Sequence, residues 1–151
     1  MIRPAKARDA SRIAEIIITN YRVNFYPYFL NDDYYFNELN VVDMASEYAA
    51  GSEELKNTWV YDDCGVVKGV VRVKGDEIEK LFVEPQFQNM RIGQTLLNYA
   101  VNELGAAWLW VLEYNIRAKA FYKHHGFEFT GEKMIEDDKV PLSKMALSAK
   151  K

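Results

Sequence analysis

The sequence has little that a cross-linked, membrane-spanning or nucleic-acid-binding protein would need. It contains one cysteine, Cys64, so no disulfide can form within the chain, and a reducing, cytoplasmic location is expected. Its start, Met1 to Lys6, has no apolar signal segment, and no apolar run is long enough to span a bilayer. The formal net charge is −3 and no basic patch with interleaved aromatics is present, so neither nucleic acid nor membrane is expected as a partner.

The sequence does have enough apolar residues to build a core. Apolar side chains make up 49% of its 151 residues, which excludes a disordered chain. This length is typical of one domain, so we expect a single domain over residues 1–151.

Strand and helix patterns alternate along the chain, which predicts an α/β sheet with helices on both faces. Strand patterns cover residues 1–6, 59–62, 66–74, 77–83, 107–113, 127–135 and 142–147. Helix patterns begin at Asp9 and at about residues 34, 89 and 115, and the second of these is expected to continue to Ala50.

The stretch from Glu77 to Leu97 combines a strand, a short polar turn and a helix. The strand ends at Pro85, and the helix is expected to open near Asn89 and to end at Gly105. The first N–H groups of a helix have no partner within the helix, so this turn is a candidate anion site.

Two segments resemble motifs of one enzyme family. The first is Val83-Glu84-Pro85-Gln86-Phe87-Gln88-Asn89-Met90-Arg91-Ile92-Gly93, followed by Leu96-Leu97, and it resembles the acetyl-coenzyme A signature of the GNAT superfamily of N-acetyltransferases. Gln88 and Gly93 match that signature, whereas Arg91 stands where the family usually has a glycine. The second is Asn115-Ile-Arg-Ala118-Lys-Ala-Phe121-Tyr122-Lys-His-His-Gly126-Phe127, which agrees with a GNAT segment at every fixed position.

The resemblance implies a GNAT-type fold, with a mixed, mostly antiparallel sheet of about six or seven strands and about four helices. It also implies acetyl-coenzyme A as co-substrate. The residues expected to bind it are Leu81, Phe82, Val83, Gln88, Asn89, Met90, Arg91, Ile92, Gly93, Gln94, Thr95, Asn115, Ala118 and Phe121.

Arg91 is expected to help coenzyme A binding, although the non-catalytic alternative given below predicts that it hinders binding. In the first turn of a helix, arginine adopts the right-handed backbone freely. The family glycine would then provide room, and the Arg91 guanidinium would swing outward toward a phosphate of coenzyme A.

The catalytic residues implied by the resemblance are Tyr122, Glu77 and Glu79. The family places the tyrosine hydroxyl beside the sulfur of coenzyme A, where it can protonate the leaving thiolate. An amine must lose a proton before it attacks, and either glutamate, directly or through a water, could accept it. Simple alternation along the strand predicts that both glutamates share a face with Leu81 and Val83.

The aromatic segment from Tyr21 to Phe36 is the candidate acceptor site. In GNAT proteins the corresponding region closes over the acceptor, a small-molecule or peptide amine. The proposed contacts are Phe25, Tyr26, Tyr28, Phe29 and Asp32. The same aromatics favour a homodimer. No metal is expected, because the adjacent His124 and His125 point about 100° apart on a helix.

Two alternatives stay open. One is a non-catalytic acyl-coenzyme A binding module of the same fold, which the departure at Arg91 favours. The other is a nucleotide-binding domain, against which the chain offers no early glycine-rich loop.

Overall fold

The computed structural model describes residues 1–137 and 139–148. The strands in this part of the chain are β1 (Ile2–Pro4), β2 (Thr58–Asp63), β3 (Val66–Lys74), β4 (Glu77–Val83), β5 (Trp108–Leu112), β6 (Phe127–Glu136) and β7 (Val140–Leu147). The α-helices are α1 (Ala10–Asn24), α2 (Tyr26–Phe29), α3 (Val41–Ser46), α4 (Glu53–Lys56), α5 (Ile92–Leu104) and α6 (Ile116–His124). Short 3-10 turns occupy Ala7–Asp9 and Pro85–Phe87, and a π-helical turn occupies Tyr34–Glu38.

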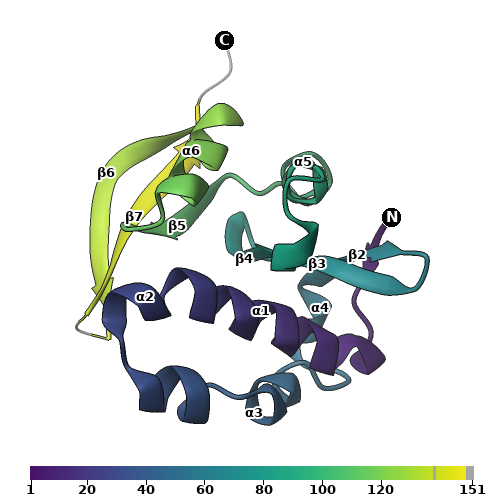
Figure 1. The fold of residues 1–151 in the computed structure, drawn as a ribbon. Coiled ribbons are helices and arrows are strands. Elements are labelled where there is room, and N and C mark those ends of the chain that lie inside the picture. The colour runs from purple at the N-terminus through teal and green to yellow at the C-terminus, as the bar shows by residue number, and fades with distance from the viewer. Residues whose placement is uncertain (138, 149–151) are drawn as a thin grey trace.

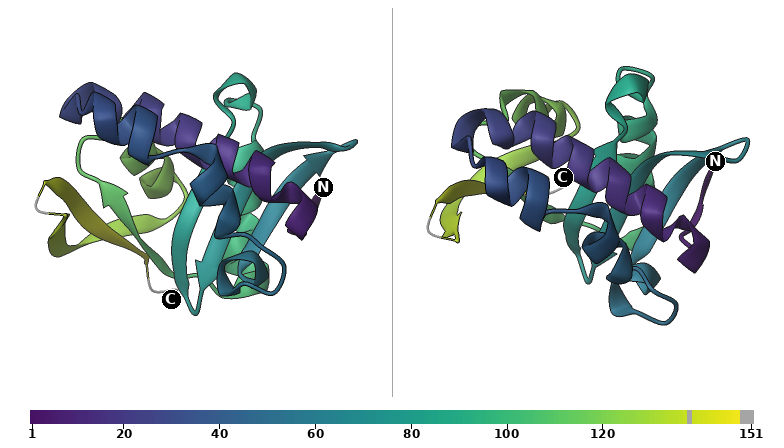
Figure 2. Two further views of the ribbon diagram at one scale, coloured as in Figure 1. Left: turned by 90° about the horizontal axis from the view of Figure 1, so that it is seen from below. Right: turned by 60° about the horizontal axis from the view of Figure 1, so that its bottom comes forward.

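The described strands form one seven-stranded sheet in the order β1-β2-β3-β4-β5-β7-β6. Neighbouring strands are antiparallel except β4 and β5, which run parallel. Figure 2 shows the half that contains β5, β6 and β7 turning away from the half that contains β1 to β4. The predicted mixed, mostly antiparallel sheet is therefore confirmed.

Helices cover both faces of this sheet (Figure 1). On one face, α5 packs Leu96, Leu97 and Ala100 into a core that also contains Phe127 and Met145 of the last two strands. On the other face, α1 packs its isoleucines against valines of β2 and β3, and Tyr48 closes this second core. The apolar spacing of three and four residues in α1 and α5 is what places these side chains on one side of each helix.

The expected single helix from Tyr34 to Ala50 is wrong. The chain there forms the π-helical turn, α3 and a turn before α4 instead. Leu39 and Asn40 are extended, and the Asn40 side chain accepts a hydrogen bond from Asp43 N at 2.9 Å, which caps a new helix. An asparagine that caps a helix interrupts the one before it, because the capping residue itself has a non-helical backbone.

Gly69 of β3 lies directly against side chains of α5. A Cβ at this position would lie 2.8 Å from Leu96 Cδ1 and 3.1 Å from Ile92 Cγ2. Leu96 is fully buried and has no room to move away. The missing side chain therefore lets the helix that follows β4 sit directly on the sheet.

We expect Gly69→Ala to lower the free energy of unfolding by about 1–3 kcal/mol, the usual cost of overpacking a core. Urea denaturation followed by circular dichroism measures it. Val66→Ala on the same strand is the matched control, because Val66 is exposed and should change little. Equal stability of Gly69→Ala and the wild type would contradict this close approach.

Candidate functional site

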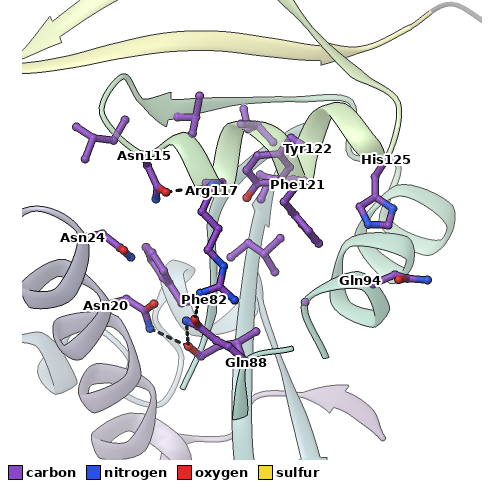
Figure 3. Close-up of a pocket in the computed structure, with 18 of the residues that line it drawn as sticks. Asn20, Asn24, Phe82, Gln88, Gln94, Asn115, Arg117, Phe121, Tyr122 and His125 are labelled. Atoms are coloured by element: carbon purple, nitrogen blue, oxygen red, sulfur yellow. Dashed lines mark hydrogen bonds between the residues drawn. The ribbon is translucent and has the colours of Figure 1, made fainter. Parts of the chain in front are cut away.

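The site begins where β4 and β5 part. These strands pair only at Glu77 with Trp108 and at Ile78 with Leu109, and beyond that point they diverge. A cavity of about 500 Å³ opens between them, lined by both strands, by α1, α5 and α6, and by the turn before α5 (Figure 3). This volume lies within the usual range for small-molecule and cofactor sites.

The free edge of β4 presents backbone groups to this cavity. Glu84 N donates to Lys68 O of β3 at 2.9 Å. Backbone hydrogen bonds alternate along an antiparallel pair, so Phe82, two residues before, also directs its N–H and C=O groups to β3. Val83 O instead accepts bonds from the side chains of Asn20, at 3.1 Å, and Gln88, at 3.3 Å. Since N–H and C=O of one strand residue lie on the same edge, Leu81 and Val83 direct their N–H groups into the opening.

The turn before α5 offers a second set of donors. The helix begins at Ile92, so the N–H groups of Ile92, Gly93 and Gln94 have no acceptor within the helix. Arg117 of α6 reaches across to this turn and donates to Gln88 Oε1 at 2.7 Å and to Asn89 Oδ1 at 2.9 Å (Figure 3). A cation and free amides at one end of the cavity fit the phosphates of a nucleotide cofactor.

The backbone at Arg91 corrects the expectation for this residue. The helix does not open near Asn89, because Asn89 and Arg91 both adopt left-handed conformations, with φ of 67° and 66°. The expected right-handed backbone at Arg91 is therefore wrong. A glycine would adopt this left-handed conformation without strain. The glycine that the family usually has here would therefore relieve the backbone as well as leave space for a phosphate. Arg91 lines the cavity, and its contact with a phosphate stays a prediction.

Tyr122 lies on the α6 side of the cavity (Figure 3). Asn115 caps α6 by accepting a bond from Ala118 N at 3.0 Å, which fixes the helix start, and Phe121 and Tyr122 follow on its inner face. Burial raises the pKa of Tyr122. The hydroxyl therefore keeps its proton at neutral pH and is available as a hydrogen-bond donor.

Glu77 and Glu79 do not line this cavity. A bulge in β4 leaves Glu79 unpaired, because Arg72 pairs with Lys80 and Val73 pairs with Ile78. The bulge turns Glu79 toward the α1 face, where it forms an ion pair with Arg72 at 3.0 Å. The predicted shared face with Leu81 and Val83 is thus wrong, since a bulge shifts the side-chain alternation by one residue. Burial, and then the charge of Glu79, raises the pKa of Glu77.

A second cavity, of about 560 Å³, lies on the α1 side of the sheet. It shares Phe25, Phe82, Trp110 and Leu112 with the first cavity, so the two meet at the gap between β4 and β5. Such a pair of connected cavities can bring two ligands together from opposite sides of the sheet.

Only two of the five residues predicted to contact the acceptor line the second cavity. Phe25 and Phe29 line the second cavity, whereas Tyr26, Tyr28 and Asp32 are not among its lining residues. Tyr26 donates to Asp32 Oδ1 at 2.5 Å, and Tyr28 stacks on Tyr114 with ring centroids 4.9 Å apart.

Most of the residues predicted to bind the cofactor line the first cavity. They are Leu81, Phe82, Val83, Gln88, Asn89, Arg91, Gly93, Gln94, Asn115, Ala118 and Phe121. Three others do not: Ile92 is buried in the core, Met90 is exposed, and Thr95 Oγ1 donates to Arg91 O at 2.8 Å.

Asn20 and Arg117 are site residues that sequence reasoning missed. Asn20 is buried, and its Nδ2 group donates to both Ile16 O, at 2.9 Å, and Val83 O. The sequence did contain a sign of this role, because Asn20 is a polar residue on the apolar side of α1, four residues after Ile16. Arg117 had no such signal, because its partners come from another part of the chain.

The part of the chain described by the structure shows neither a metal-binding group nor a membrane helix. No three His, Cys, Asp or Glu side chains there lie close enough together to hold an ion. No helix there is both long enough and apolar enough to cross a bilayer.

Comparison with known proteins identifies the family. Residues 54–129 match the model of the acetyltransferase (GNAT) domain, and this span includes β4, α5 and both motifs. The chain belongs to the GNAT acetyltransferase family.

Curated relatives match over a shorter region. The chain is 30% identical over 69 residues to peptidyl-lysine N-acetyltransferase YjaB of Salmonella typhimurium, which covers 46% of this chain and 48% of that protein. It is 29% identical over 69 residues to YjaB of Escherichia coli, covering 46% of this chain and 47% of that protein. The matched region thus spans about half the length of these relatives.

Solved structures confirm the GNAT fold. YjaB of Escherichia coli in its apo form has a TM-score of 0.77 at 23% identity, covering 97% of this chain and 95% of that one. An N-acetyltransferase of Staphylococcus aureus Mu50 has a TM-score of 0.75 at 17% identity, covering 97% and 100%. At these identities the likeness concerns the fold alone.

We expect Arg91→Gly to raise the free energy of unfolding by about 1 kcal/mol, because glycine adopts the left-handed conformation without a steric cost. Thermal denaturation should show a melting temperature about 2–4 °C higher. Met90→Gly, an exposed neighbour without a positive φ, is the matched control and should gain nothing. A less stable Arg91→Gly variant would contradict the strain argument.

Proposed function

We propose that this protein transfers an acetyl group directly from acetyl-coenzyme A to a primary amine of a small molecule or a peptide. The observation that carries the proposal is the meeting of two cavities at the gap between β4 and β5, with Tyr122 on the wall of one of them. Membership of the GNAT family supports the reaction class. A PaiA N-acetyltransferase of Thermoplasma acidophilum, with a TM-score of 0.63 at 16% identity, was solved in complex with coenzyme A, which supports the choice of cofactor.

The first cavity is the proposed site of coenzyme A. The N–H groups of Leu81 and Val83 are placed to bond the amides of the pantetheine arm as an additional strand would. The free amides at the start of α5, with Arg117 beside them, would hold the pyrophosphate. When bound, acetyl-coenzyme A supplies an acetyl thioester, which an amine can attack without a covalent enzyme intermediate.

Tyr122 acts on the departing sulfur in this proposal. As the carbon–sulfur bond breaks, the sulfur gains negative charge, and the Tyr122 hydroxyl donates a hydrogen bond and a proton to it. The proton that the attacking amine releases to water then restores the hydroxyl, so one proton passes in total from the amine to the thiol. Burial raises the pKa of the hydroxyl, so the tyrosine does not lose its proton before that bond breaks.

The acceptor amine enters from the second cavity. An alkyl ammonium has a pKa near 10.4, so freeing its lone pair at pH 7 costs about 4–5 kcal/mol. Neither Glu77 nor Glu79 lines either cavity, so a water must carry the proton from the amine if one of them is the base. The names of the YjaB relatives make a peptide lysine one acceptor to test.

The non-catalytic alternative receives less support. A module that only binds coenzyme A needs the first cavity but has no use for a second one that opens onto the thioester position. Arg91, which favoured that alternative, adopts a conformation that glycine would share, so the substitution preserves the path of the backbone.

We expect acetyl-coenzyme A, at one hundred times its dissociation constant, to stabilise the protein by about 2.7 kcal/mol. This corresponds to a melting shift of roughly 5–10 °C for a domain of this size. Scanning fluorimetry measures the shift, with ATP and NAD at equal concentration as controls. Absence of any shift at millimolar acetyl-coenzyme A would remove the cofactor from the proposal.

We expect Tyr122→Phe to lower kcat by about 10²–10⁴-fold, because it removes only the oxygen that stabilises the leaving sulfur. The melting shift with acetyl-coenzyme A should be preserved. Release of free thiol, followed with a chromogenic disulfide, measures the rate. Tyr99→Phe on α5 is the matched control, since Tyr99 packs near Trp59 and lines neither cavity. Normal turnover of Tyr122→Phe at saturating substrates would make Tyr122 a packing residue only.

A further inference from the structure

Among the described residues, three cations line the second cavity: Arg72 of β3, Lys80 of β4 and the exposed Lys139 just before β7. Arg72 and Lys80 lie on adjacent strands and pair with each other. Arg72 is already neutralised by Glu79, to which its Nε donates at 3.0 Å, and its Nη1 also donates to Tyr48 Oη at 2.9 Å. The Arg72 side chain is only 14% exposed. Lys80 is also half-buried, so its charge is partly removed from water.

Lys80 differs from Arg72 in having no carboxylate partner among the described residues. Its Nζ contacts the Tyr21 hydroxyl and lies 4.9 Å from the centroid of the Tyr21 ring. A tyrosine neutralises none of the lysine's charge. A half-buried ammonium group that has no ion pair with any described carboxylate binds a ligand anion favourably, because the anion compensates a charge that is partly removed from water.

Other groups in the cavity complement such an anion. Tyr34 and Tyr35 line it, and burial raises the pKa of both hydroxyls, so they are protonated donors at neutral pH. The acids that line the cavity are Glu47, after α3, and Glu136 and Asp137 at the end of β6. Lys80 and Arg72 belong to the sheet and give the cavity a basic floor, whereas the three acids, together with Lys139, come from the flanking segments.

We propose that the acceptor is a small amino carboxylate, whose carboxylate binds Lys80 while its amine reaches the gap between β4 and β5. This inference rests on the proposed function and names the substrate class of the same site. Lys80 and Phe82, which lines both cavities, are two residues apart on one face of β4, roughly 7 Å. That spacing fits an amine and a carboxylate separated by few carbon atoms.

The walls of the cavity favour an apolar side chain on this acceptor. Phe25 and Phe29 line the cavity together with Tyr21, whose ring lies 5.0 Å from that of Phe25. Phenylalanine and leucine are therefore suitable probes, and their decarboxylated forms, phenethylamine and isoamylamine, differ from them only in the carboxylate.

The experiment compares each amino acid with its decarboxylated amine in two assays. One assay is acetyl transfer, followed by thiol release, and the other is calorimetric titration of each compound into the coenzyme A complex. The wild type should show at least tenfold higher kcat/KM for the amino acid, chiefly through KM, and tighter binding in the titration. Lys80→Met should bring both ratios close to one, and Lys80→Arg should restore most of the preference.

The controls separate this inference from the proposed function. Lys74→Met removes an exposed lysine at the end of β3 and should keep the preference. The melting shift with acetyl-coenzyme A should be equal in all variants, since Lys80 does not line the first cavity. Loss of that shift in the wild type would contradict the proposed function, while titration of the same compounds into the protein without coenzyme A would still decide the carboxylate site.

Three results would overturn the carboxylate site. The first is that the wild type acetylates or binds the decarboxylated amines as well as the amino acids, or transfers acetyl groups only to peptide lysines. The second is a preference for the amino acid that persists unchanged in Lys80→Met. The third is failure of both amino acids to bind the coenzyme A complex.

Discussion

Strands β4 and β5 stay together for only two residue pairs, and both cavities exist because the strands then separate. A parallel pair that continued to Val83 would bond the edge of β4 to β5 and leave no amide for a ligand. Helix α1 secures the separated end of β4 from the opposite face. Asn20 donates to Val83 O, and Arg12 forms an ion pair with Glu84 at 2.7 Å. The fold thus holds an unpaired strand edge open inside a packed domain.

Several parts of the site depend on this open edge. The first cavity has backbone donors along β4 and at the start of α5, and it ends near Tyr122 of α6. The second cavity reaches the same gap from the α1 side, with Lys80 on its floor. The elements that meet here come from the whole length of the chain. A change in how α1 or α6 packs would therefore alter the relative positions of a bound thioester and an incoming amine.

The two motifs contain most of the residues that line the first cavity outside α1 and β5. They could be recognised because they depend on short-range features of the sequence. The strand, turn and helix from Glu77 to Gly105 follow from side-chain spacing and from Pro85, and Asn115 marks the start of α6 by capping it. Glu79 was misplaced because a bulge changes which way a side chain points and leaves no sign in the pattern of apolar residues. The interrupted helix after Tyr34 was missed because Asn40 capped a new helix inside an apparently continuous pattern.

The sequence by itself determined the fold class, the family and most of the lining of the first cavity, since these follow from side-chain spacing within each element and from two continuous motifs. Only the tertiary structure decided which charges the acceptor would meet. Lys80 lies in the second cavity beside Tyr21 because β4 and α1 pack together there, and the nearby Glu79 forms its ion pair with Arg72 instead. Lys80 therefore has no carboxylate partner in the described part of the chain. Arg117 likewise meets Gln88 only because α6 packs across the gap. Contacts between residues far apart in the chain depend on how the helices pack on the sheet, and the spacing of residues within one element does not predict them.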